Sequence, residues 1–277
     1  MSTEIQLPSE WEHPSAQELP SGQELPAAQE LKDAVVELHG AWDKQWEAVL
    51  ELAPRLLAAY VRLAGVPQRK GHLDAKTREL VYLAVDAAAT HMYAPGVRRH
   101  IRRALDLGAT PGEITEVIEL TTTVGIHAMN IGVPLLAELL EERGLRHGPG
   151  ELDAYRTELK ERFTANRGYW HEFWDEILEL DPELFEAYTD FSSVSWQNGS
   201  LEPKVKEFIY TAFDCASTHL YVKGWKAHMD NALGYGATVG ELLEVMEIAS
   251  VMGMQSALQA LPVLSEELLT RTAPAGR

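Results

Sequence analysis

The chain has 277 residues, 45% of them apolar and 24% charged, which is typical of a globular protein with one large domain or two ordinary ones. Its 42 acidic and 24 basic residues give a net charge of −18, which excludes the basic surface of a nucleic-acid-binding protein and disfavours anionic membranes. The single cysteine, Cys215, excludes an intramolecular disulfide, and neither a signal peptide nor an uncharged membrane-spanning run is recognised. These properties predict a soluble, cytoplasmic protein.

Residues 1–30 differ from the rest of the chain. They repeat a short Gln-Glu-Leu-Pro unit and contain few residues that could build a core. This composition predicts a disordered or loosely docked N-terminal arm. The alternative is an arm that wraps a neighbouring subunit, because disordered segments often become ordered on binding.

From about residue 31 the apolar residues recur with helical spacing, and no stretch alternates with period two, so an all-α fold is predicted. One helix is expected from about Asp74 to Thr90. Two further helix starts are marked by capping boxes, Thr110 with Glu113 and Thr238 with Glu241. Glycines and prolines, rather than hairpin signals, separate the helices.

The second half of the chain repeats the first. THMYAPGVRRHIRRALDLGAT begins at Thr90 and THLYVKGWKAHMDNALGYGAT at Thr218, an offset of 128 residues. The same offset pairs distant positions without a gap, among them Trp42/Trp170, Trp46/Trp174, Pro54/Pro182, Glu116/Glu244 and Pro134/Pro262. This indicates a tandem duplication with modules at 31–147 and 151–277. The Gly-Pro-Gly at 148–150 is the predicted junction, and the modules are expected to pack as a pseudo-symmetric pair.

Polar residues that both copies share identify a candidate site. Glu79, Tyr82, Asp86 and Thr90 are spaced to lie on one helix face. Beyond them both copies read Glu-x11-His-x-Tyr-x2-Gly-x3-His, with the histidines at His91 and His100 in the first copy and at His219 and His228 in the second.

A histidine near a carboxylate is a workable general acid/base, so proton transfer is the predicted chemistry. Glu79 and Glu207 are the candidate carboxylates. A structural role for these residues, closing a helix junction and forming an ion pair, is the alternative and is about equally supported, since structural networks also preserve polar residues.

A bound divalent metal is a second alternative. The candidate ligands are Glu79, His91 and His100, and in the second copy Glu207, His219 and His228, if a helix break lets them converge. His127 would add a ligand in the first copy only, because its counterpart is Gln255. No compact metal-binding motif such as His-Glu-x-x-His is present to support this.

The segment from Glu79 to Leu136 and its copy from Glu207 to Leu264 resemble the carboxymuconolactone decarboxylase/alkylhydroperoxidase D family. The resemblance implies an antiparallel helical fold that commonly assembles into trimers or hexamers of modules, so a homo-oligomer is expected. Members that reduce peroxides carry a Cys-x-x-Cys pair, and those positions here are Tyr93 and Gly96, and Tyr221 and Gly224. Without thiols, disulfide-based peroxide reduction is excluded.

The decarboxylase members lack those cysteines and use no cofactor, so none is expected here. By this resemblance His100 and His228 carry proton transfer, while His91, His219, Glu79 and Glu207 set charge and tautomer. Tyr93 and Tyr221 are expected to orient a substrate carboxylate or enolate, and His127 is a further candidate substrate-binding residue. An anionic substrate also needs a basic anchor, which Arg99 and its neighbours offer in the first copy alone.

Three hypotheses follow from the sequence. The first is a cofactor-independent, decarboxylase-like enzyme that acts on a small organic acid or lactone. The second is a metal-dependent enzyme that uses the Glu/His/His sets. The third is a non-catalytic oligomeric scaffold of the same fold.

Overall fold

The computed structural model describes residues 25–148 and 150–272, and every regular element within them is helical, which confirms the predicted all-α class. The predicted arm lies outside the described residues up to residue 24, and α1 already begins at Ala28. The first repeat contains α1 (Ala28–His39), α2 (Lys44–Leu52), α3 (Pro54–Lys70), α4 (Ala75–Ala87), α5 (Ala94–Asp106), α6 (Pro111–Thr121), the short η2 (Thr122–Ile126) and α7 (His127–Glu142). The second contains α8 (Ala154–Arg167), η3 (Glu172–Trp174), α9 (Asp175–Leu180), α10 (Pro182–Asn198), α11 (Pro203–Cys215), α12 (Val222–Gly234), α13 (Val239–Ser250), η4 (Val251–Gly253) and α14 (Met254–Thr272).

The helix ends follow the capping signals in the sequence. Both predicted capping boxes are confirmed, with the Thr110 and Thr238 side chains accepting from the backbone N–H of Glu113 and Glu241. The helix expected to reach Thr90 instead ends at Ala87, so Thr90 is exposed in the following turn and does not share the face of Glu79.

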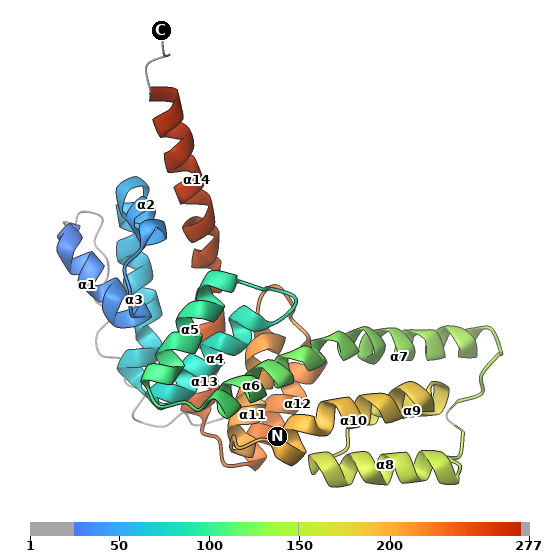
Figure 1. Cartoon of the computed structure of the whole chain (residues 1–277). Coiled ribbons are helices and arrows are strands. Elements are labelled where there is room, and N and C mark those ends of the chain that lie inside the picture. Colours follow the sequence, from blue (N-terminus) through green and yellow to red (C-terminus); the bar gives the residue numbers. More distant parts are fainter. Residues whose placement is uncertain (1–24, 149, 273–277) are drawn as a thin grey trace, which may run out of the picture.

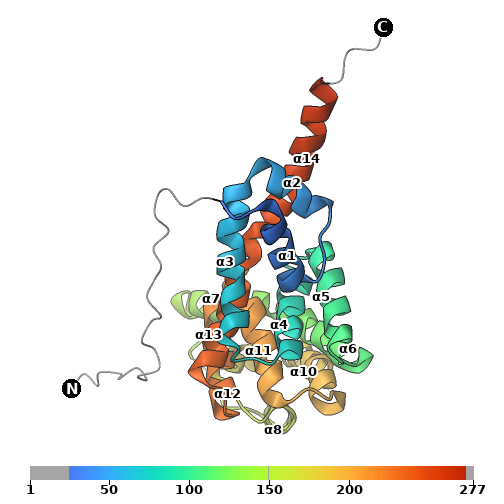
Figure 2. The same cartoon turned by 90° about the vertical axis from the view of Figure 1, so that its left-hand side faces the viewer.

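The central core is built from both repeats. Buried side chains of α4, α6, α11 and α13 form one cluster that includes Leu80, Val117, Phe208 and Val245. Figure 1 shows these helices grouped in the middle of the molecule, and Figure 2 shows α4 and α11 between α13 and α6. The two repeats therefore share one hydrophobic core.

Two lobes extend from this centre (Figure 1), and each combines the first helices of one repeat with the last helix of the other. Val251, Met254 and Leu258 of the second repeat pack against the α1–α3 cluster of the first. On the other side, Val133 of α7 packs with Phe163 and other side chains of α8–α10.

Two buried glutamates join the repeats at equivalent positions. Glu116 on α6 accepts the backbone N–H groups of Ser200 and Leu201 at 2.7 and 2.9 Å and lies 2.8 Å from the Lys206 ammonium group. Its counterpart Glu244 likewise accepts two backbone N–H groups before α4 and the Nε–H of Arg78 at 2.7 Å. The pairing of the repeats is thus pseudo-symmetric, as predicted.

Two helical stretches, Pro111–Glu142 and Val239–Thr270, are long and apolar enough to cross a membrane by length and composition. Core helices of soluble proteins meet the same criterion, and both stretches contribute side chains to the shared core, among them Val117 and Val245. Each is also a composite of two helices with a 3-10 segment between them. The expectation of no membrane partner stays a prediction.

Candidate active site

A tight turn after α4 creates the first site. Met92 has a positive φ of 49°, and the backbone N–H of Tyr93 returns to the carbonyl of Asp86 at 2.9 Å. The chain therefore reverses within a few residues, and α5 runs back along α4. This is the helix break that allows residues nine positions apart, His91 and His100, to face the same place.

His100 and Glu79 form a buried pair across α4 and α5. The His100 Nδ1 lies 2.7 Å from Glu79 Oε2, and the two residues are 4% and 3% exposed. Arg103 donates from Nε to the other carboxylate oxygen at 2.6 Å, and the Tyr82 ring stacks on the imidazole at 4.7 Å. Burial alone would raise the pKa of Glu79, but its bond to His100 and the nearby charges of His100 and Arg103 outweigh it and hold that pKa below the usual value.

Asp86 lies between the two histidines. Its Oδ2 is 3.6 Å from His100 Nε2, and its Oδ1 is 3.8 Å from His91 Nε2. Burial raises the pKa of Asp86. The sequence marked Asp86 as a shared residue on the helix face but did not select it for the site, because its position between the imidazoles depends on the turn.

The first site is completed by the second repeat. Gln255, on α14, donates its Nε2–H to Asp86 Oδ1 at 2.7 Å, and its Oε1 lies 2.5 Å from His91 Nε2. A hydrogen-bonded chain thus runs from His91 through Gln255 to Asp86. Sequence comparison identified Gln255 only as the counterpart of His127, because no sequence signal shows which residues cross between repeats.

The second site repeats the pair with different surroundings. His228 Nδ1 lies 2.6 Å from Glu207 Oε2, and Tyr210 stacks on the imidazole at 4.4 Å. Where the first site has Arg103, the second has Asn231, whose Nδ2 is 3.4 Å from Glu207 Oε1. Asp214, the counterpart of Asp86, faces His228 Nε2 at 4.0 Å.

His127 lies in the second site, so the expectation that it adds a ligand in the first copy is wrong. Its Nδ1 is 2.6 Å from His219 Nε2 and 3.7 Å from Asp214 Oδ1, and its ring stacks on Tyr221 at 4.0 Å. Burial lowers the pKa of His127 to about 3 and also lowers that of His219. Burial and the Glu207 charge raise the pKa of Asp214 well above its ordinary value.

The Glu/His/His sets considered as metal ligands do not converge on one point. In the first copy Glu79 contacts Nδ1 of His100. His91 instead approaches Asp86, and Asp86 faces Nε2, on the other side of the His100 ring. Within the described ranges, the group compact enough to hold a metal ion is His127, Asp214 and His219.

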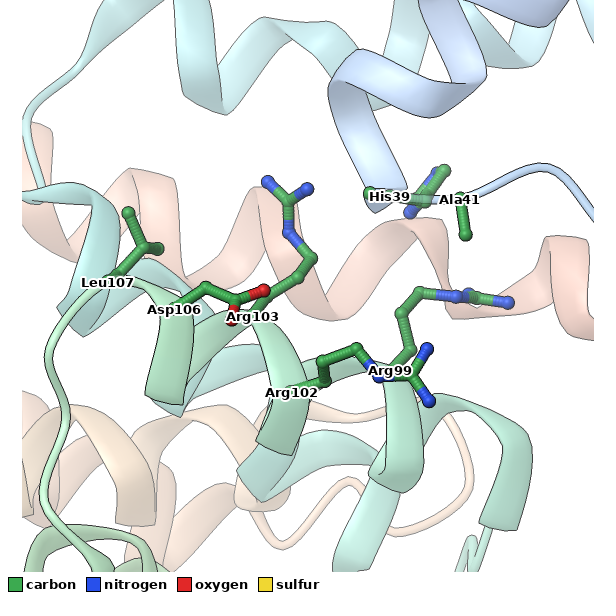
Figure 3. A pocket seen from close by; sticks show the side chains of 8 residues that line it. His39, Ala41, Arg99, Arg102, Arg103, Asp106 and Leu107 are labelled. Carbon is green, nitrogen blue, oxygen red and sulfur yellow. The ribbon is translucent and has the colours of Figure 1, made fainter.

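The first site opens to a basic surface through two neighbouring pockets. The inner one, of about 20 Å³, contacts His100, Asp86 and Gln255, and the outer one, of about 180 Å³, lies beside it; His39 and Arg99 line both. Figure 3 shows the outer pocket, with Arg99, Arg102 and Arg103 projecting from α5 near the end of α1. Their counterparts in the second repeat are Ala227, Asp230 and Asn231, so the basic surface has no equivalent there.

The other candidate substrate-binding residues, Tyr93, Tyr221 and Arg99, lie next to the two histidine sites. Tyr93 and Tyr221 are buried beside His91 and His219, with ring centroids 6.3 and 6.2 Å apart in the two copies. Arg99 places its guanidinium over the Trp46 ring at 5.8 Å, at the wall of the inner pocket.

Comparison with known proteins identifies the family of the chain. The profile of the carboxymuconolactone decarboxylase family matches twice, at residues 54–130 and 182–266. A crystal structure from Burkholderia xenovorans LB400, provisionally named a gamma-carboxymuconolactone decarboxylase subunit, is 54% identical, with a TM-score of 0.88 over 90% of this chain and 100% of that one. No curated protein gave a significant match. The chain therefore belongs to the carboxymuconolactone decarboxylase family, as a member that carries two copies of the family module.

Proposed function

We propose that the chain is a decarboxylase-like lyase that acts on a small anionic lactone or organic acid in its first repeat, by acid/base catalysis at His100. The observation that carries the proposal is the buried His100–Glu79 pair with Asp86 facing its free nitrogen and an arginine-lined pocket outside. The similar Burkholderia protein is named for the same reaction class.

Acid/base catalysis at His100 follows from which of its nitrogens is free. Because Glu79 accepts at Nδ1, the proton available for transfer is on Nε2, the nitrogen that faces Asp86 at 3.6 Å; His100 and Asp86 both line the inner pocket. When the bond between the substrate carbon and its carboxylate breaks, carbon dioxide leaves and the electron pair stays on the substrate. His100 donates its Nε2 proton to that carbon, and the negative charge of Glu79 stabilises the imidazolium before transfer.

The first repeat is the proposed reacting copy because an anionic substrate needs a cation. Arg99 lines both pockets, and Arg102 and Arg103 line the outer one. On a chain with a net charge of −18, such a cluster is a local exception that would concentrate an anion at the entrance. The proposed reaction needs no thiol pair, and the chain has none, since Cys215 is its single cysteine.

A panel of lactone acids and keto acids, with carbon dioxide release as the readout, tests the proposal. His100→Gln is expected to lower kcat by at least about 100-fold, since a positioned acid contributes that much. Arg99→Gln is expected to raise KM about tenfold with a smaller change in kcat, because it removes a charged contact to the substrate. The matched control is His147→Gln, on an exposed loop.

Turnover that survives His100→Gln would overturn the catalytic assignment. The absence of turnover on every acid of the panel would favour the scaffold alternative. The other expectations, a homo-oligomer in the cytoplasm with neither nucleic acid nor membrane as partner, stay predictions.

A further inference from the structure

The second site contains a group of side chains that the proposed reaction does not use. His127 is the first residue of α7 in the first repeat, Asp214 is near the end of α11, and His219 is in the turn before α12. One ligand atom from each lies within 4.8 Å of the others. His127 Nδ1 lies 2.6 Å from His219 Nε2. Asp214 Oδ1 lies 3.7 Å from His127 Nδ1 and 3.9 Å from His219 Nε2.

Asp214 is the reason to expect a ligand here. Its side chain is 0% exposed, and neither carboxylate oxygen has a hydrogen-bond partner among the described residues. A buried carboxylate with no donor costs free energy, and such groups in folded proteins are paired or coordinate metals. Both oxygens face imidazoles at distances too long for a hydrogen bond but consistent with a shared ligand.

The first repeat provides an internal comparison. There the counterpart of His127 is Gln255, whose amide donates to Asp86 and accepts from His91. An amide has one donor and one acceptor end, so it satisfies both neighbours without a cation. In the second repeat an imidazole replaces the amide, the carboxylate loses its donor, and three metal-ligating atoms gather instead.

We propose that His127, Asp214 and His219 bind a divalent metal ion of the Zn²⁺ type, which links the two repeats. Two imidazole nitrogens and one carboxylate oxygen form a ligand set that Zn²⁺ and other late first-row metals accept, with a fourth position left for water. Bonds of about 2.0–2.1 Å in a tetrahedron separate ligand atoms by about 3.3 Å. The two carboxylate distances are near that value, and the imidazoles must separate slightly, which the partly exposed His219 can do by rotating.

This proposal is independent of the proposed decarboxylation. The metal site is in the second repeat, whereas the reacting histidine is in the first, and the measurement below is of binding rather than turnover. Equivalent positions of the two copies would then have different functions, acid/base catalysis in the first repeat and metal binding in the second.

The test is a titration of the full chain, first freed of metal by a chelator, with Zn²⁺ in competition with a chromophoric chelator. One equivalent per chain is expected to bind. His127→Gln, which installs the residue of the first copy, is expected to weaken binding by at least about 100-fold, because even outer partners of a ligand contribute 10- to 100-fold. The matched control is His91→Gln, at the equivalent site of the first repeat, and it is expected to leave Zn²⁺ affinity unchanged.

Co²⁺ gives a second readout. The wild-type chain is expected to show the intense visible absorption of tetrahedral Co²⁺, and His127→Gln is expected to lose it. Should His127→Gln fail to fold, as circular dichroism would reveal, His219→Gln provides the same comparison. The proposal is overturned if the wild-type chain binds no stoichiometric Zn²⁺, or if a folded ligand variant binds it as tightly as the wild type does.

Discussion

At the residue scale, the two buried aspartates show how one neighbour decides the chemistry of a group. Asp86 and Asp214 occupy equivalent positions on α4 and α11, each beside a Glu/His pair. Gln255 donates to the first, whereas the second has no donor within the described chain. The same carboxylate therefore belongs to a hydrogen-bonded chain in one repeat and to a candidate metal site in the other.

Gly96 lets α5 approach Asp86 closely. A Cβ at this position would overlap with the Asp86 carboxylate and lie 2.7 Å from the Tyr93 ring. We expect Gly96→Ala to lower the free energy of unfolding by about 1–3 kcal/mol, because overpacking forces neighbours out of place. It should also reduce turnover by displacing Asp86. Urea unfolding and the carbon dioxide assay measure the two effects.

The control for this prediction is Gly132→Ala on α7, where a Cβ would meet no atom within 4 Å. Alanine is the better helix former, so this change is expected to raise the free energy of unfolding by up to about 1 kcal/mol. Equal effects at the two glycines would contradict the close approach described for Gly96.

At the element scale, the buried glutamates of α6 and α13 hold the repeats together. Glu116 caps the backbone N–H groups before α11 and faces the Lys206 ammonium group, with both side chains 3% exposed. Such a contact joins elements that are far apart in sequence at a position where water cannot substitute for either partner.

Glu116→Gln is expected to lower the free energy of unfolding by about 3–5 kcal/mol, because the amide still accepts the backbone bonds but leaves the Lys206 charge uncompensated. Denaturant unfolding measures this, with the exposed Glu138→Gln on α7 as the control, expected to change stability by less than about 0.5 kcal/mol. A loss as small as that of the control would mean that the buried pair contributes nothing to stability.

At the scale of the whole molecule, the repeats exchange their last helices. The α14 helix packs on α1–α3, and α7 packs on α8–α10, so each half of the chain leaves apolar faces that only the other half covers. Each candidate site is likewise completed across the repeats, by Gln255 in one direction and His127 in the other. Duplication within one chain has made these crossings intramolecular.

We therefore expect that residues 25–148, expressed alone, form no folded monomer, because the shared core and both lobes would be incomplete. Mixing this half with residues 150–277 should restore cooperative unfolding, with an apparent stability that depends on concentration. Circular dichroism and size-exclusion chromatography with light scattering measure both outcomes. A monomeric first half that unfolds cooperatively would contradict the expectation.

The sequence by itself determined what depends on local chemistry and on repetition. Helical spacing and capping residues identified the all-α fold, and a constant offset identified the duplication and the paired residues Glu79/Glu207 and His100/His228. The contact between Glu79 and His100 could be predicted from the sequence because the two residues lie on consecutive helices joined by a short turn. Such a contact depends mainly on local structure.

Only the tertiary structure decided how the repeats exchange residues. It put His127 in the second site rather than the first, brought Gln255 to Asp86, and separated the Glu/His/His sets that spacing had suggested as metal ligands. The physical reason is that these contacts join residues from 92 to 169 positions apart, and their geometry depends on how two apolar faces pack. Helix periodicity shows that such faces exist, but not which face of the other repeat covers them.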